Sequence, residues 1–361
     1  MVQTNSNPDC WSSHKLLLSI VVPAYNCKKW INKLLESIDF SYHSYFEIYI
    51  IDDGSTESFY DEVKPWLDRF QCIKYFYKKN GNWGSVINYV KPLLNGCWIK
   101  IIDSDDQIVT GNFPRYLEYL QSEKVQKSDL VITPYLMRHL KSNFDTLNSF
   151  RLNKKGIILS SFDSFIFHFK IVTHHYLTIR NELFQTLIPL PEGYIYSADN
   201  CLVYQCIMRS KTIAFLPIDC PLYIYNVENP EQSTALNNIM RNKGKYVNVI
   251  NDISSIPILN SVGHLRRKIL YRFIRSMFYY AVLIFSLDYN STDVEKKQEI
   301  GQLIDVLFKN MSKKVGKHIL SSNPLIWLIY QKNVKIIVYV FRIVYRSMKK
   351  GMIKAIRESN V

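Results

Sequence analysis

The feature that most constrains the fold is an alternation of short apolar runs with segments of helical period between residues 15 and 106. Such apolar runs are typical of strands buried on both faces. Strands that alternate with helices at short spacing predict a parallel sheet with helices on both sides, an α/β fold. The expected strands are residues 15–22, 47–51, 72–77 and 98–102, and the expected helices are 28–38, 57–70 and a segment ending near Leu94.

Three of these strands end in polar or acidic residues. The first is followed by Tyr25 and Asn26, the second ends at Asp52–Asp53, and the fourth leads into Asp103–Asp106. Each turn taken alone is explained by local turn chemistry. In parallel sheets, however, ligands bind beyond the carboxyl ends of the strands. Three such clusters at one edge therefore indicate a binding site.

The last cluster holds three carboxylates within four residues, Asp103, Asp105 and Asp106. These groups repel one another unless a cation neutralises them. Hard oxygen ligands suit Mg²⁺ or Mn²⁺, which would bridge to the oxygens of a diphosphate. The sequence contains no glycine-rich phosphate loop, which argues against a P-loop NTPase and a dinucleotide oxidoreductase. The pattern favours a nucleotide held through metal and carboxylates, with Asp53 able to accept from a nucleobase N–H.

Three segments together resemble the family 2 glycosyltransferases of the GT-A fold: Ser19–Asn26, Ile50–Thr56 and Ile101–Asp106. Their order, spacing and strand context agree over residues 16–135. The resemblance implies a mostly parallel nucleotide-binding sheet flanked by helices. It also implies a bacterial enzyme of the kind found in capsule, teichoic acid or other surface polysaccharide synthesis.

The resemblance implies roles for individual residues. Ala24 and Tyr25 would lie against the base of the donor, and Asp53 would bind its N–H edge. Asp103 and Asp105 would contact ribose and metal. The implied donor site comprises Pro23, Ala24, Tyr25, Asp53, Asn82, Gly84, Asn88, Asp103 and Ser104, with Asp103 and Asp105 as metal ligands and Asp106, Gln232 and Ser233 in support.

The helix that follows the loop at Asn80 departs from the family pattern. Residues 80–88 match the pattern Asn-Gly-x-x-Gly-x-x-x-Asn, but the helix lacks the arginine that faces the diphosphate in many relatives. Lys79 or the metal would take its place. The later loop at Gln232–Thr234 resembles the family loop that closes over the donor, and it too lacks the usual arginine.

The segment Tyr196–Asn200 resembles the Glu-Asp segment whose aspartate is the catalytic base of the family. Ala198 stands where the usual preceding acid would be, so the match depends on Asp199. A helix N-cap is the alternative role for Asp199. His174 and His175 lie between two apolar segments. A buried, hydrogen-bonded state is favoured for them over contact with the acceptor.

Most of the net charge of +14 belongs to the last part of the chain. Residues 264–361 carry 19 Lys and Arg against 6 Asp and Glu, a balance of +13, which leaves +1 for residues 1–263. Basic and aromatic residues at helical spacing are typical of helices in an anionic membrane interface. A helical cap with a solvated basic face is the alternative. Nucleic acid is not expected, because no motif for it occurs.

Seven scattered cysteines with no C-x-x-C spacing suggest neither a disulfide framework nor a zinc site, and they fit a reducing cytosol. No apolar stretch reaches the 18 to 20 residues, roughly, that a spanning helix needs. We therefore expect a cytoplasmic protein, with peripheral attachment to the cytoplasmic face of the membrane as the alternative. The expected segments are a tail (1–14), a GT-A domain (15–240) and a helical basic region (241–361).

The sequence thus predicts an inverting, hexosyltransferase-type glycosyltransferase (EC 2.4). Its donor would be a nucleoside-diphosphate sugar, with UDP-sugar favoured, and its acceptor a glycan or a lipid-linked molecule. Two alternatives stay open. A nucleotidyltransferase also uses a parallel sheet and metal-binding carboxylates, and a degenerate transferase would act as a binding module without catalysis.

Overall fold

The computed structural model describes residues 16–150, 153, 158–161, 172–193, 198–227, 243–255, 271, 274, 275, 277, 278, 281, 282 and 292–310. The chain divides into two compact units, residues 1–230 and 231–361. The three predicted segments, 1–14, 15–240 and 241–361, stay predictions.

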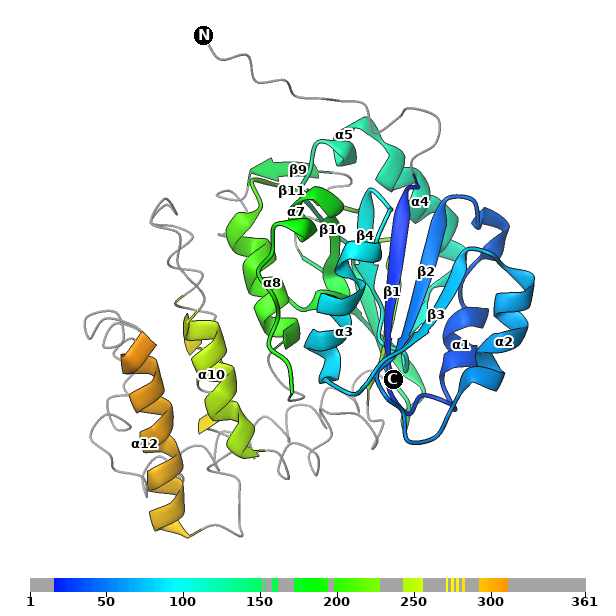
Figure 1. Ribbon diagram of the computed structural model, residues 1–361. Coiled ribbons are helices and arrows are strands. Elements are labelled where there is room, and N and C mark those ends of the chain that lie inside the picture. The colour runs from blue at the N-terminus through cyan, green and yellow to red at the C-terminus, as the bar shows by residue number, and fades with distance from the viewer. Residues whose placement is uncertain are drawn as a thin grey trace. The chain divides into compact units, whose positions relative to one another are not determined.

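An eight-stranded sheet forms the centre of the first unit (Figure 1). Its strand order is β3-β2-β1-β4-β10-β6-β11-β9, in which β10 and β9 run antiparallel to their neighbours and all other pairs are parallel. The sheet is therefore mostly parallel, as predicted. Its strands are β1 (Leu18–Ala24), β2 (Phe46–Asp52), β3 (Ile73–Tyr77), β4 (Trp98–Ile101), β6 (Leu130–Ile132), β9 (Ile158–Ser161), β10 (Leu177–Arg180) and β11 (Thr212–Phe215).

The central strands β1 and β2 are buried along their whole length, which explains their nearly continuous apolar sequences. They pair in register from Leu18 opposite Phe46 to Ala24 opposite Asp52. Because the register is parallel, the polar residues that follow both strands reach the same edge of the sheet. The four strands predicted at the start of the chain agree with β1 to β4 to within a few residues.

A second sheet of four strands was not predicted from the sequence. Its order is β5-β12-β7-β8, and β12 pairs in parallel with β7 and antiparallel with β5. This sheet joins the turn after β4 to a strand more than a hundred residues later. Its strands are β5 (Gln107–Ile108), β7 (Tyr135–His139), β8 (Phe144–Asn148) and β12 (Tyr223–Val227).

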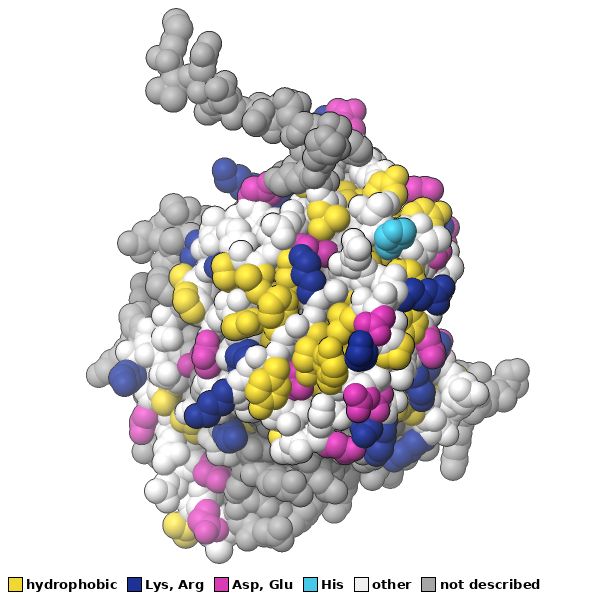
Figure 2. Space-filling view, turned by 45° about the vertical axis from the view of Figure 1, so that its right-hand side comes forward, with side chains coloured by type: hydrophobic (Ala, Val, Ile, Leu, Met, Phe, Trp, Pro, Cys, Tyr) yellow, Lys and Arg dark blue, Asp and Glu magenta, His cyan; other side chains and the backbone are white. Residues whose placement is uncertain are grey.

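Helices flank the main sheet (Figure 1). Helices α3 and α8 lie next to each other, and α1 packs against α2. The α-helices among the described residues of this unit are α1 (Ile31–Glu36), α2 (Tyr60–Arg69), α3 (Asn82–Val90), α4 (Phe113–Gln121), α5 (Glu123–Gln126), α7 (Asn181–Gln185) and α8 (Ala198–Arg209). Figure 2 shows one face of the molecule, on which hydrophobic side chains form a band interrupted by charges of both signs. This mixture agrees with the near-neutral charge balance of residues 1–263.

The described part of the second unit contains two helices that pack together, α10 (Tyr246–Ser255) and α12 (Asp293–Asn310). Asn310 donates from its side-chain amide to Asn251 and to the hydroxyl of Ser254 at 2.9 Å. Thr292 and Glu295 exchange side-chain and backbone hydrogen bonds, which forms a capping box at the start of α12. In the part of the chain that the structure describes, no helix combines the length and apolar character that crossing a bilayer requires. Most of the basic region from residue 264 lies outside the described residues.

Candidate active site

The loops after β1 and β2 are tied together at the carboxyl edge of the sheet. The amide of Asp53 donates to the carbonyl of Ala24 at 2.8 Å. The side-chain oxygen of Asn26, a residue in the left-handed region at φ 50°, accepts from the amide of Thr56 at 2.9 Å. These bonds join the loop that carries the exposed Tyr25 to the loop that carries the buried Asp53.

The carboxylate of Asp53 is held by the loop that precedes α3. Its Oδ1 atom accepts from Lys78 Nζ at 2.6 Å, from the amide of Gly81 at 3.0 Å and from Ser85 Oγ at 3.4 Å. Gly54 has φ +72°, and a Cβ there would lie 2.7 Å from the Asn80 amide nitrogen. Only glycine allows this close approach between the two loops. Lys78 is the cation that pairs with Asp53, whereas Lys79 is exposed.

Asp103, just after β4, connects to the same loop through the first turn of α3. Its Oδ1 atom accepts from Trp83 Nε1 at 3.1 Å and its Oδ2 atom from His174 Nε2 at 3.0 Å. Burial acts to raise the pKa of Asp103, but the charge and hydrogen bond of His174 outweigh it and hold this pKa well below its usual range. The loop and first turn formed by residues 78–85 therefore contact both carboxylates, Asp53 and Asp103.

Hydrogen bonds from β12 support the acidic turn, which is formed by Asp103–Asp106 after β4. Tyr223 donates its hydroxyl to Asp106 Oδ2 at 2.5 Å and accepts from the amide of Asp103 at 3.1 Å. The amide of Asn226 donates to Asp106 Oδ1 at 2.8 Å, and its side-chain amide donates to the carbonyl of Asp105 at 2.7 Å. Burial, with the nearby charges of Asp105 and Asp103, raises the pKa of Asp106 well above its usual value. Through these hydrogen bonds Asp106 anchors the acidic turn to β12.

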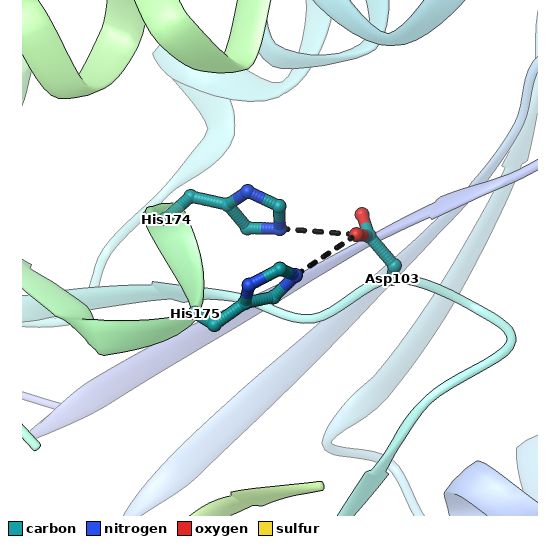
Figure 3. Close-up of side chains that lie close together, drawn as sticks. All are labelled: Asp103, His174 and His175. Carbon is teal, nitrogen blue, oxygen red and sulfur yellow. Dashed lines mark hydrogen bonds and ion pairs between the residues drawn. The ribbon is translucent and has the colours of Figure 1, made fainter. Parts of the chain in front are cut away.

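Three side chains form a group able to hold a metal ion: Asp103, His174 and His175 (Figure 3). The Nε2 atom of His175 lies 3.9 Å from Asp103 Oδ2, which is too long for a hydrogen bond. This nitrogen is buried and has no hydrogen-bond partner among the described residues, as is also true of His174 Nδ1. A buried nitrogen without a partner that points at a carboxylate fits a metal ligand. Asp105, the other predicted ligand, is half-buried in the same turn and is not in this group.

Asp199 lies in the first turn of α8, which begins at Ala198. Its carboxylate accepts from the side-chain amide of Asn200 at 3.1 Å. Burial raises the pKa of Asp199, and the nearby charge of His174 opposes that shift only in part. A carboxylate whose pKa is raised is a stronger base once it is ionised. The position inside the helix differs from the N-cap position that was the alternative for Asp199.

The chain matches the family model described as glycosyl transferase family 2 over residues 19–185. A glycosyltransferase of Mycoplasma pneumoniae, the MG025 homolog, is 30% identical over 227 residues, which cover 62% of this chain and 71% of that protein. The chain belongs to the family 2 glycosyltransferases. Membership in this family makes the protein a glycosyltransferase and decides against the nucleotidyltransferase alternative.

Two further similarities concern part of the chain and the fold. The Escherichia coli UDP-Glc:α-D-GlcNAc-diphosphoundecaprenol β-1,3-glucosyltransferase WfaP is 34% identical over 110 residues, 30% of this transferase and 43% of WfaP. The crystal structure of S. aureus TarS 1–349 in complex with UDP-GlcNAc aligns with a TM-score of 0.68 at 20% identity and covers 92% of each chain. This likeness shows that the transferase has the predicted GT-A fold.

The structure locates several of the residues that were predicted to bind the sugar donor of the transferase. Pro23 lies within β1, Ser104 is buried in the acidic turn, and Asn82 begins α3 at φ 67°. The side chain of Asn88 bonds the chain at Leu190, donating to its carbonyl at 2.9 Å and accepting from its amide at 2.8 Å. Gln232 and Ser233 lie outside the described residues.

Sequence reasoning on the transferase missed the roles of Trp83, Tyr223 and Lys100. Lys100 is 1% exposed and donates to the carbonyls of His175 at 2.6 Å and Leu177 at 3.0 Å. Burial lowers the pKa of Lys100 to about 7. A lysine inside an otherwise apolar strand was the available signal, because a buried ammonium needs specific partners. The two histidines were expected to be buried, and the structure confirms this.

Proposed function

We propose that this transferase moves a sugar from a nucleoside-diphosphate sugar to a hydroxyl of a glycan or lipid-linked acceptor, with inversion at the anomeric carbon. The observation that carries the proposal is the connection of the three carboxylates Asp53, Asp103 and Asp199. Residues 78–85 contact the first two carboxylates, and the charge of Asp199 helps to raise the pKa of His174, which is hydrogen-bonded to Asp103. In the proposal Asp53 and Asp103 bind the donor, and Asp199 is the base.

In this proposal the donor lies at the carboxyl edge of the sheet. The exposed ring of Tyr25 stacks on the base, and the rigidly held Asp53 accepts from its N–H edge. Asp103 faces the ribose and the diphosphate. Asp103 and Asp105 would hold a divalent ion, Mg²⁺ or Mn²⁺, and this ion would supply positive charge to stabilise the leaving diphosphate.

Asp199 is the proposed general base. The acceptor oxygen attacks the anomeric carbon on the face opposite the diphosphate, so that the new C–O bond forms as the bond to the phosphate oxygen breaks. The proton of the acceptor hydroxyl passes to the Asp199 carboxylate, and the nucleoside diphosphate leaves. One displacement of this kind inverts the anomeric configuration, and the raised pKa of Asp199 suits proton abstraction.

The donor and pathway are proposed from the relatives. WfaP is named for UDP-Glc and a diphosphoundecaprenol acceptor, and TarS was crystallised with UDP-GlcNAc. We propose a UDP-sugar donor and a part in cell-surface polysaccharide synthesis. The test is a screen of common nucleotide sugars with Mn²⁺, scored by release of the nucleoside diphosphate. Release from a UDP-sugar is expected. Release from none of the sugars, or only from donors with another base, would contradict the proposed donor class.

The basic region from residue 264 is proposed to attach the enzyme to the cytoplasmic face of an anionic membrane, where a lipid-linked acceptor is presented. The support is its balance of +13 with aromatic residues among the cations. Flotation with anionic and neutral liposomes tests this for the full chain. Preference for anionic vesicles that weakens at high salt is expected. Equal flotation with both vesicle types would leave the region as a helical cap.

A further inference from the structure

The side-chain atoms of Asp103, His174 and His175 lie close enough together to bind a single metal ion. Two atoms that bind one ion at about 2.1 Å each can lie at most about 4.2 Å apart. The separations from Asp103 Oδ2 to the two Nε2 atoms, 3.0 Å and 3.9 Å, both satisfy this limit. All three ligand atoms lie within 4.8 Å of one another. The distance between the ligating nitrogens of His174 and His175, which is at most 4.8 Å, would therefore need to shorten by no more than about 0.6 Å for both to bind one ion.

The ring of His175 is oriented as a metal ligand would be. Its Nδ1 atom is hydrogen-bonded to Thr173 Oγ1 at 3.0 Å, which leaves Nε2 as the atom that faces Asp103. Ligating histidines almost always use the other ring nitrogen for such a second hydrogen bond. The ring also stacks on Tyr225 with centroids 4.4 Å apart. Lys100 holds the His175 carbonyl at 2.6 Å. His175 is thus fixed on three sides, while its inward nitrogen has no hydrogen-bond partner among the described residues.

We infer that His174 and His175 bind the divalent ion of this enzyme together with Asp103, and that the site therefore selects a transition ion such as Mn²⁺ over Mg²⁺. Imidazole nitrogen is a poor ligand for Mg²⁺, which prefers oxygen atoms and retains its water. The inference rests on the proposed metal-dependent donor site and specifies its ligands. If the carboxylates of the acidic turn were the ligands without the histidines, all protein ligands would be oxygen atoms, and no preference for Mn²⁺ over Mg²⁺ would be expected.

The test is pulsed electron paramagnetic resonance of Mn²⁺ bound to the purified full chain, without nucleotide. Coupling of the Mn²⁺ electron spin to ¹⁴N of imidazole is expected in the unmodified protein. His175→Ala should weaken that coupling and reduce Mn²⁺ affinity by at least about tenfold. His43→Ala is the matched control, since His43 is exposed, and it should change neither. Competition dialysis should show Mn²⁺ retained in an excess of Mg²⁺.

The outcomes separate this inference from the proposed function. Bound Mn²⁺ without nitrogen coupling would overturn the histidine ligands and leave metal at Asp103 and Asp105 intact. Loss of Mn²⁺ to equal Mg²⁺ would overturn the selectivity. Donor turnover in excess EDTA would contradict the metal-dependent donor site itself. Since the nitrogen coupling is measured on the unmodified chain, the test does not depend on the folding of any variant.

Discussion

Gly84 lies so close to Pro191 that a Cβ atom at position 84 would be 1.9 Å from the Pro191 carbonyl oxygen. The same Cβ would lie 3.0 Å from the Cβ of Ala198, the first residue of α8. Non-bonded carbon atoms pack at about 3.5–4.0 Å. The missing side chain at position 84 therefore lets α3, whose first turn contacts Asp103, meet the helix that carries Asp199.

Gly84→Ala is expected to push α3 away from Pro191 and from the start of α8. We expect the free energy of unfolding to fall by about 1–3 kcal/mol, as for overpacked sites, and turnover to fall as well. Denaturant unfolding and a turnover assay measure both. Gly111→Ala is the control, because a Cβ there meets no atom within 4 Å. Equal effects of the two changes would show that the close approach at Gly84 does not matter.

Tyr223→Phe removes the hydroxyl that joins Asp106 to the amide of Asp103. The buried carboxylate and the amide both lose a partner, so we expect a loss of about 1–3 kcal/mol in the free energy of unfolding. The acidic turn should also hold its carboxylates less firmly, which lowers donor affinity in a binding titration. Tyr77→Phe, at a ring that is 65% exposed, should leave both quantities unchanged. Unaltered donor affinity in Tyr223→Phe would argue against the bridge.

Lys100 predicts a pH dependence of stability. Its pKa is about 7 in the folded chain and 10.5 for an ordinary lysine, so the unfolded chain binds more protons between these values. The stability of the unmodified protein should therefore rise with pH over this window relative to Lys100→Met, by up to about 1.4 kcal/mol per pH unit. Below pH 7 the amine is charged in both states and the burial cost is complete. Urea unfolding of both proteins from pH 6 to 10 measures the difference, and parallel curves would refute the shift.

The parallel half of the fold and its acidic edge were predictable because the signals are local. Runs such as β1 are apolar along their whole length, and the residues at Asp53 and Asp103 that stop the strands follow them directly in sequence. Parallel pairing then brings these strand ends to one edge without further information.

The contacts that complete the site were not predictable, because they join residues far apart in sequence. His174 reaches Asp103 across 71 positions and Tyr223 reaches Asp106 across 117. His174 lies just before β10, which is four residues long, and Tyr223 lies in β12, which pairs with the two-residue strand β5. Short strands carry too few residues for a periodic pattern to show.

The central claim is that Asp199 is the base of a single displacement, and turnover of Asp199→Asn measured beside its donor affinity tests it most directly. The amide cannot take the acceptor proton, so turnover should fall by about 10²- to 10⁴-fold while donor affinity stays unchanged. Asp68→Asn, at an exposed carboxylate of α2, should retain full turnover. Retained turnover in Asp199→Asn, or a donor affinity that falls in step with turnover, would contradict the role of Asp199 as the base.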